Sequence, residues 1–159
     1  MSKKLAFDCT FEIFDAFDQL TEQDKSIVKA AIESAARAYA PYSHFNVGSA
    51  VVSRKGDIIT GNNQENAAYP SGLCAERVAL FSAFSKCPDV QITAIAIVAN
   101  RNGKSKPAFP CGSCRQTILK YEIKQKHPIR VVMAYHKGAY LVTNSIKDLL
   151  PLGFTRNDL

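Results

Sequence analysis

Cys74-Ala75-Glu76-Arg77 and Pro110-Cys111-Gly112-Ser113-Cys114 decide how this chain is organised, because each stretch opens a predicted helix: the first leads into the apolar run 78–81 and the second into the run 115–119. Together they place three thiols at the starts of two predicted helices, with one carboxylate, Glu76, two residues after the first thiol. A tetrahedral Zn²⁺ bound by three thiolates keeps its fourth position for water, as in catalytic sites. The two stretches therefore predict a zinc site held by Cys74, Cys111 and Cys114, in which Glu76 moves the protons of that water.

The charge of such a site has to be compensated, because three thiolates around Zn²⁺ leave a net negative charge. Helix N-termini carry a partial positive charge and lower the pKa of nearby thiols. Arg77 and Arg115 each follow a predicted ligand directly and are candidates to donate to the sulfurs. Arg77 is the preferred candidate, since Arg115 also suits an exposed helix surface.

Other interpretations of the cysteines remain open at this point. Cys111 and Cys114 match a thioredoxin-like redox pair, although that motif should follow an early strand and needs no third cysteine. A closed structural zinc site needs a fourth ligand, and no further His or Cys stands near either stretch at ligand spacing. His44, His127 and His136 are interpreted as loop or surface residues. Cys9 and Cys87 have no partner at a useful spacing and are interpreted as small apolar residues.

The composition is that of an ordinary soluble domain, with 159 residues, 47% hydrophobic and 21% charged. No apolar run approaches the about 20 residues of a membrane span. Acidic residues from Asp8 onward replace the apolar core of a secretory signal, so we expect a reducing, cytoplasmic location. The net charge of +6 is dispersed and lacks a basic stripe interleaved with aromatic residues. Binding to nucleic acid or to a membrane is therefore not expected.

The order of predicted elements is α-β-β-α-β-α-β-β-α. We expect an α/β fold with three α-β-α layers around a mixed sheet of about five strands. Residues 1–20 mix aromatic and acidic residues and predict an N-terminal arm that packs its phenylalanines on a single domain at 21–159. The predicted helices begin at Thr21, Cys74, Cys111 and after Asn144; the predicted strands run to Ser53 and over 58–61, 92–99, 129–135 and 139–143.

Several local signals refine this order. Thr21 is the expected N-cap of the first helix, with Asp24 at the reciprocal position of a capping box. Lys55-Gly56-Asp57 and Asn102-Gly103 are expected turns, and Lys104–Phe109 is expected to be a flexible lead-in to Pro110. The polar stretch 62–70 runs directly to Cys74 and is either a substrate-contacting loop or an ordinary surface loop. Composition alone favours the surface loop.

Five separated motifs resemble those of the small, three-cysteine cytidine deaminases, over roughly residues 21–159. Two are the cysteine stretches quoted above. The others are Pro41-Tyr42-Ser43-His44-Phe45-Asn46-Val47-Gly48, Asn63-Gln64-Glu65-Asn66-Ala67-Ala68-Tyr69, and Leu149-Leu150-Pro151 with Phe154. The resemblance implies a zinc-dependent enzyme that forms homotetramers with shared active sites and converts cytidine and deoxycytidine to uridine and deoxyuridine for pyrimidine salvage.

The resemblance also implies roles for individual residues. Cys74, Cys111 and Cys114 would bind one Zn²⁺ per chain, and Glu76 would be the proton shuttle when zinc-bound hydroxide attacks C4. Asn63 and Glu65 would bind the ribose, which changes the interpretation of loop 62–70 to a functional one. The remaining substrate contacts would come from Phe45, Tyr69 and Ala75, and from Phe154 of a neighbouring subunit.

Three rival functions remain. A deaminase of another small aminopyrimidine, such as blasticidin S, would use the same chemistry. A polynucleotide cytosine deaminase would need an open groove with a basic rim. A non-catalytic zinc protein is the third, although it would have no use for Glu76.

Overall fold

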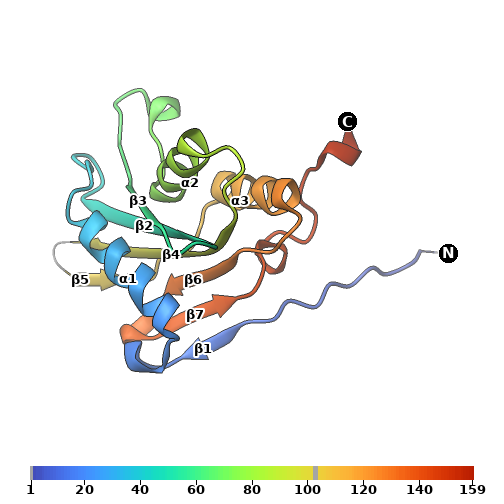
Figure 1. Cartoon of the computed structure of the whole chain (residues 1–159), viewed down its shortest axis with the longest axis horizontal. Helices are drawn as coiled ribbons and strands as arrows, with labels where there is room; N and C mark the ends of the chain where they lie inside the picture. Colours follow the sequence, from blue (N-terminus) through green and yellow to red (C-terminus); the bar gives the residue numbers. More distant parts are fainter. Residues whose placement is uncertain (1, 102–103) are drawn as a thin grey trace.

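The computed structural model describes residues 2–101 and 104–159, and its described part contains one seven-stranded mixed sheet (Figure 1). The strand order is β1-β7-β6-β4-β2-β3, and β5 extends from β4. Strands β4 and β6 pair in parallel, whereas the other described pairs are antiparallel. The strands are β1 (Glu12–Phe14), β2 (Phe45–Ser53), β3 (Ile58–Asn62), β4 (Ile92–Arg101), β5 (Lys104–Lys106), β6 (Arg130–Ala134) and β7 (Tyr140–Thr143).

Three α-helices cover the two faces of this sheet. Helix α1 (Glu22–Ala35) lies on one face, and α2 (Ala75–Lys86) and α3 (Gly112–Gln125) lie side by side on the other (Figure 1). Strand β4 lies in the middle of the sheet, between the two helix layers. Its central residues are fully buried, as its continuous apolar sequence predicts. The predicted three-layer α/β architecture is confirmed.

Two glycines allow helices to approach the sheet closely from opposite faces. A Cβ atom on Gly48 would lie 1.9 Å from the carbonyl oxygen of Ala31 in α1. A Cβ atom on Gly61 would lie 2.4 Å from the amide nitrogen of Ala79 in α2. Both contacts are too short for any side chain, so glycine at these positions fixes the distance between each helix and the sheet. Helix α2 carries Glu76, and Gly61 therefore helps to position the site.

The sheet is larger than expected because two short strands join its margins. Strand β1 lies within the expected N-terminal arm and pairs with β7, while Phe11, Phe14 and Phe17 pack against the core. The expectation that Lys104–Phe109 is a flexible lead-in was wrong for Lys104–Lys106, which pairs with the end of β4 as β5. The expected turn at Asn102-Gly103 lies outside the described residues.

The helix ends agree with the signals predicted from the sequence, except at Asp24. Thr21 caps α1, and its hydroxyl accepts a hydrogen bond from the amide of Asp24. Asp24 does not close a capping box: its fully buried carboxylate accepts hydrogen bonds from Nε of Arg130, the shorter at 3.1 Å. The short helix expected after Asn144 is the 3₁₀ helix Ile146–Asp148. The other 3₁₀ helices are Phe17–Gln19, Tyr69–Ser71, His136–Gly138 and Arg156–Asp158.

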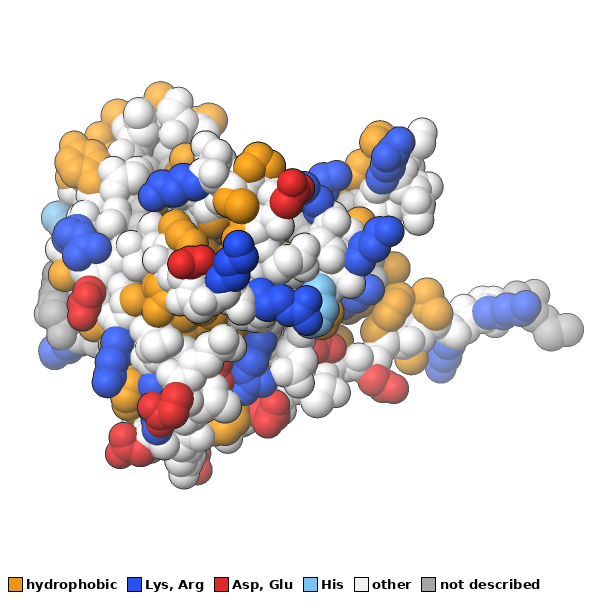
Figure 2. Space-filling view, in the orientation of Figure 1, with side chains coloured by type: hydrophobic (Ala, Val, Ile, Leu, Met, Phe, Trp, Pro, Cys, Tyr) orange, Lys and Arg blue, Asp and Glu red, His pale blue; other side chains and the backbone are white. Residues whose placement is uncertain are grey.

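The surface shows mixed charges and dispersed apolar groups (Figure 2). His44, His127 and His136 are exposed, as expected. Cys9 and Cys87, which were interpreted as small apolar residues without a partner, are both free and exposed. No helix in the described part of the chain is both long and apolar enough to cross a membrane.

Candidate metal centre and substrate cavity

Three thiols meet where α2 and α3 begin. Cys74 is the N-cap residue of α2 and Cys111 is the N-cap residue of α3, and neither side chain caps its own helix. Cys114 lies in the first turn of α3 and is fully buried. The sulfurs of Cys74 and Cys111 are 3.8 Å apart, and those of Cys111 and Cys114 are 3.5 Å apart. The N-cap positions are thus used to gather sulfur atoms at a point of positive helix-end potential.

The spacing of these sulfurs fits a tetrahedral zinc ion. Zinc–sulfur bonds of about 2.3 Å place the ligand atoms of a regular tetrahedron about 3.8 Å apart. The sulfur atoms of all three cysteines lie within 4.8 Å of one another, and no fourth His, Cys, Asp or Glu joins this group in residues 2–101 and 104–159. The donor set therefore fits one zinc ion per chain with one position left for a fourth, non-protein ligand.

The two arginines that follow the cysteines have different environments. Nη2 of Arg77 lies 3.8 Å from the sulfur of Cys74, within the range of a weak N–H···S hydrogen bond. Arg115 instead donates from Nε to the carbonyl oxygen of Pro110, at 2.9 Å, and from Nη1 to that of Leu149, at 3.0 Å. Arg77 therefore directs its charge at the thiols, whereas Arg115 links the start of α3 to the C-terminal segment.

The pKa values of the Cys74 and Cys114 thiols are shifted in opposite directions. A hydrogen bond from Cys114, with smaller contributions from Arg77 and Cys111, lowers the pKa of Cys74 to about 5 although burial opposes this. The same hydrogen bond and the burial of Cys114 raise the pKa of its thiol. Since thiols bind metal as thiolates, Cys74 is prepared for binding and Cys114 has to release a proton when the metal binds.

Glu76 is the one acidic residue in the first turn of α2, and only 3% of its surface is exposed. Burial raises the pKa of this carboxyl to about 7; its own backbone amide opposes the rise, and the charge of Cys74 adds to it. A carboxyl with a pKa near neutrality is suited to accept a proton and to return it within one reaction cycle.

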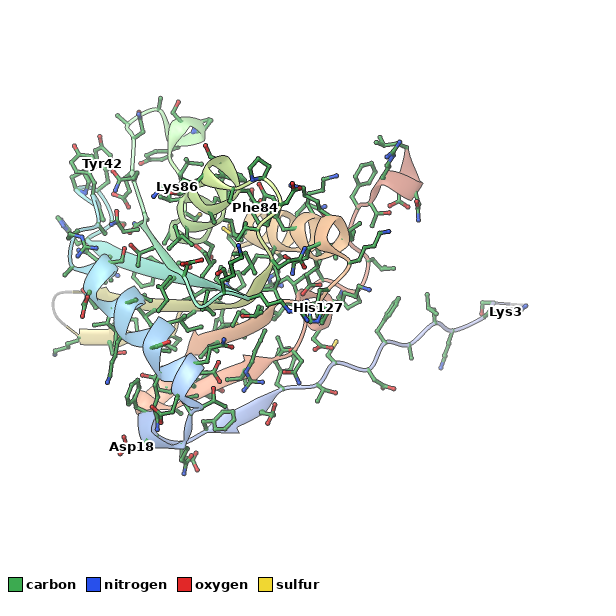
Figure 3. The ribbon with its side chains drawn as sticks, in the orientation of Figure 1. Lys3, Asp18, Tyr42, Phe84, Lys86 and His127 are labelled. Atoms are coloured by element: carbon green, nitrogen blue, oxygen red, sulfur yellow. The ribbon has the colours of Figure 1, made fainter. Side chains whose placement is uncertain are left out.

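Glu76, Cys74 and Cys111 line a cavity of about 620 Å³. This volume suits a small organic ligand. Four of the predicted substrate contacts line it as well: Phe45, Asn63, Glu65 and Ala75. Tyr69 lines an adjoining hollow of about 450 Å³, which also contains Arg77 and Tyr42. Figure 3 shows Tyr42 in the turn that precedes β2.

Asn63 and Glu65 also organise the wall of this cavity. The Asn63 side chain accepts a hydrogen bond from the amide of Val47, at 2.8 Å, and donates to the carbonyl of Phe45, at 3.0 Å. Glu65 accepts hydrogen bonds from the Ser43 hydroxyl and from the backbone amides of Tyr42 and Ser43. The bond from the Ser43 hydroxyl is the main cause of the lowered pKa of Glu65. Both side chains are held in fixed orientations beside the cavity.

Phe154 lies away from the sulfurs of its own chain. Its amide donates to the side chain of Gln116 at 3.1 Å, and its carbonyl accepts from the same side chain at 2.7 Å. Its ring is 58% exposed and lines a separate hollow of about 510 Å³ with Phe81 and Tyr121. Within one chain, Phe154 therefore does not contribute to the cavity that contains Glu76.

Six further residues line the main cavity, and sequence reasoning assigned no role to them: Ser43, Val47, Ile97, Pro107, Ala108 and Phe109. Ile97 was hidden in the uniformly apolar run of β4, where nothing distinguishes one residue from its neighbours. The available signal for Phe109 was its position next to Pro110-Cys111; the preceding residue, Ala108, is buried, and its amide donates to the carbonyl oxygen of Ala134 at 3.0 Å.

Comparisons with known proteins agree with this geometry. Residues 21–128 match the family described as "Cytidine and deoxycytidylate deaminase zinc-binding region". The chain is 37% identical over 133 residues to a cytidine deaminase of Halalkalibacterium halodurans, covering 84% of this chain and 95% of that protein. It is 30% identical over 142 residues to a blasticidin-S deaminase of Bacillus cereus, covering 87% of this chain and 96% of that protein.

A solved structure supports the same relationship. The crystal structure of cytidine deaminase from Burkholderia pseudomallei superposes with a TM-score of 0.71 at 40% sequence identity. The match covers 85% of this chain and 100% of that one. With the cysteine cluster, the buried glutamate and the matched region in agreement, the chain belongs to the zinc-binding cytidine and deoxycytidylate deaminase family.

Proposed function

We propose that this protein is a zinc-dependent cytidine deaminase that hydrolyses cytidine and deoxycytidine to uridine and deoxyuridine with release of ammonia. The observation that carries the proposal is the buried carboxyl of Glu76 beside three sulfurs with zinc-ligand spacing, at the wall of a cavity of about 620 Å³. The cytidine deaminases among its relatives, at 37–40% identity, support the choice of substrate.

Cys74, Cys111 and Cys114 hold the zinc ion in this proposal. When bound, the metal supplies a Lewis acid that lowers the pKa of a water molecule toward 7. Glu76 accepts a proton from the attacking water and delivers it to ring N3, which makes C4 more electrophilic. Once the water oxygen is bonded to C4, Glu76 passes the remaining proton of that water to the 4-amino group; the C4–N bond then breaks, ammonia leaves and C4 becomes a carbonyl. Arg77 offsets the charge of the thiolates through its contact with Cys74.

The cavity wall positions the nucleoside. Phe45 packs on the pyrimidine ring, and Asn63 and Glu65 bind ribose hydroxyl groups from the orientations that their backbone contacts fix. Ala75 lies between the ligand Cys74 and Glu76 and contacts the base edge, and Tyr69 lies near the outer part of the site. Ribose and base are thereby held with C4 toward Glu76.

A homotetramer with shared active sites completes the proposal. Phe154 and Phe81 expose apolar rings, 58% and 41% exposed, beside a hollow between α2, α3 and the C-terminal segment. Exposed apolar groups of this kind support association with another subunit. In the tetramer, Phe154 reaches into a neighbouring site. The role is pyrimidine salvage in the cytoplasm.

The test is the absorbance change and ammonia release when zinc-loaded protein is mixed with cytidine. Rapid loss of the cytosine band is the expected result. Blasticidin S and a single-stranded oligonucleotide are the matched alternatives, since a relative at 30% identity is a blasticidin-S deaminase. Turnover of either one without turnover of cytidine, at one zinc per chain, would contradict the proposal.

A further inference from the structure

The N-terminal arm, residues 2–11, carries apolar side chains that stay exposed in the single chain. It runs away from the body of the molecule, and Lys3 lies far from Asp18 at the other end of the segment (Figures 1 and 3). It lies outside the matched family region, which begins at residue 21. Neither the metal centre nor the cavity involves the arm.

A strand pattern is present in this arm and in β1. From Leu5 to Ile13, every second residue is apolar or cysteine: Leu5, Phe7, Cys9, Phe11 and Ile13. Between them stand mostly polar residues: Ala6, Asp8, Thr10 and Glu12. Alternation of this kind, interrupted only by the small residue Ala6, is typical of a β-strand with one covered face. The alternation is confined to this segment, and it disappears when residues 1–20 are considered together.

Only the end of this segment is paired. Glu12–Phe14 forms β1 against β7, at the edge of the sheet, and in the described chain its second edge has no partner. Most of the apolar face is exposed: Leu5 by 77%, Phe7 by 47% and Ile13 by 59%, and Cys9 is exposed as well, whereas Phe11 is partly buried against the core. An uncovered strand of this kind, continuous with a free sheet edge, is a template for pairing with another chain.

The sequence of the segment is complementary to itself. If two copies run antiparallel about a two-fold axis through Cys9, Leu5 faces Ile13 and Phe7 faces Phe11. The same register places Lys3 opposite Asp15. Apolar residues and opposite charges thus match in a single alignment, and directly opposed side chains of these kinds stabilise antiparallel pairs. A two-fold contact uses the same patch on both partners, as this one does.

We propose that the N-terminal arm pairs with the arm of a second copy of this chain, with Leu5–Ile13 antiparallel to Leu5–Ile13 and Cys9 at the two-fold axis. The contact joins the β1 edges of two subunits into a continuous sheet. The salt bridge between Glu12 and Arg130, at 3.6 Å, anchors the base of the arm to β6. This contact is separate from the surface around Phe154 and does not depend on the proposed deaminase activity.

Disulfide cross-linking of the full-length, zinc-loaded protein tests the contact. Opposed residues of an antiparallel pair have Cα atoms about 4.5–5.5 Å apart, within the range that a disulfide spans. In the Cys87→Ser variant, mild oxidation with diamide should therefore link Cys9 to Cys9 and yield a covalent dimer on a non-reducing gel. The Cys9→Ser variant, which keeps the exposed Cys87, should stay monomeric on that gel. Absence of the dimer from the Cys87→Ser variant overturns the proposal.

A matched variant separates a specific pairing from random encounter of exposed thiols. Adding Phe7→Asp to Cys87→Ser keeps Cys9 exposed but places an unpaired charge against Phe11 of the second copy. We expect cross-linking to slow at least about tenfold, with unchanged zinc content and melting temperature. Cross-linking at the rate of the parent variant shows that the arms meet without pairing, which also overturns the proposal.

The register is tested by moving the cysteine. In a Cys9→Ser/Cys87→Ser background, Leu5→Cys and Ile13→Cys proteins are each oxidised alone and after co-expression. A disulfide should form between the two variants in the co-expressed sample and not within either variant alone. If each variant links to itself as readily as to the other, the antiparallel register about Cys9 is wrong.

Discussion

Glu76 and Glu122 are the same residue type on neighbouring helices and are almost equally buried, with 3% and 5% of their surfaces exposed, yet their surroundings differ. Glu122 accepts hydrogen bonds of 2.9 Å from the amides of Ile129 and Ile146 and from the hydroxyl of Ser145. Glu76 faces the sulfur cluster and the cavity, and burial raises its pKa to about 7.

The difference separates a structural carboxylate from a reactive one. Three donors fix Glu122 and join α3 to the residue that precedes β6 and to the start of the 3₁₀ helix Ile146–Asp148, so its oxygens are already engaged. Glu76 lies at a cavity wall where a ligand can exchange protons with it. A buried carboxylate saturated by backbone donors stabilises a fold, whereas one facing a cavity beside a metal site is suited to proton transfer.

The largest effect is expected from loss of the metal, on which the role of Glu76 depends. Cys111→Ala should lose zinc and all measurable deamination, because the two remaining thiols supply too few protein ligands to hold the ion. Zinc per chain and cytidine turnover are the measurements. Cys87→Ala is the control, since it removes an exposed thiol outside the cluster and should change neither quantity. Retained zinc in Cys111→Ala would contradict the ligand assignment.

Glu122→Gln should affect stability and leave the chemistry unchanged. Glutamine keeps the shape but loses the charge that strengthens three buried hydrogen bonds, so we expect about 1–3 kcal/mol less free energy of unfolding. Urea denaturation measures the loss, and kcat for cytidine should stay within about twofold, because Glu122 does not line the cavity. A large loss of kcat in a protein that remains folded would remove the distinction between the two glutamates.

Thr21→Ala should give the smallest effect, and it shows what the loss of an ordinary N-cap costs, for comparison with the cysteine N-caps of α2 and α3. The hydroxyl of Thr21 caps α1, whereas the N-cap residues of α2 and α3 are cysteines of the metal cluster. Loss of the cap should cost about 1 kcal/mol of stability with no change in zinc content or turnover. Loss of zinc from Thr21→Ala would show that the cap of α1 and the metal site are coupled, which this structure does not predict.

Local sequence was enough to predict the cluster of three cysteines because the cluster is built from local motifs. Cys74 and Glu76 share one helix start, and Cys111 and Cys114 share another, so each spacing carries its geometry with it. That the N-termini of α2 and α3 lie close together could not be predicted from either motif alone. It followed from the need of three thiols to share one metal, and the sulfur distances agree with it.

Other features have no local signal. Strand β5 contains only three residues, all polar, which is too short for a hydrophobic period. The partner of Asp24 is Arg130, 106 residues away, so nothing near Asp24 showed that it would form an ion pair and not a capping box. The three donors of Glu122 likewise come from segments that only the tertiary fold brings together.

Glu76→Gln is the most direct test of the central claim that Glu76 is the proton-transferring group of a zinc deaminase. The variant should bind one zinc per chain and melt at the temperature of the parent protein or above it, because the neutral side chain removes a buried charge. Its rate of cytidine deamination, followed by loss of the cytosine absorbance, should fall by about 10²–10⁴-fold. Full activity at one zinc per chain would contradict the account.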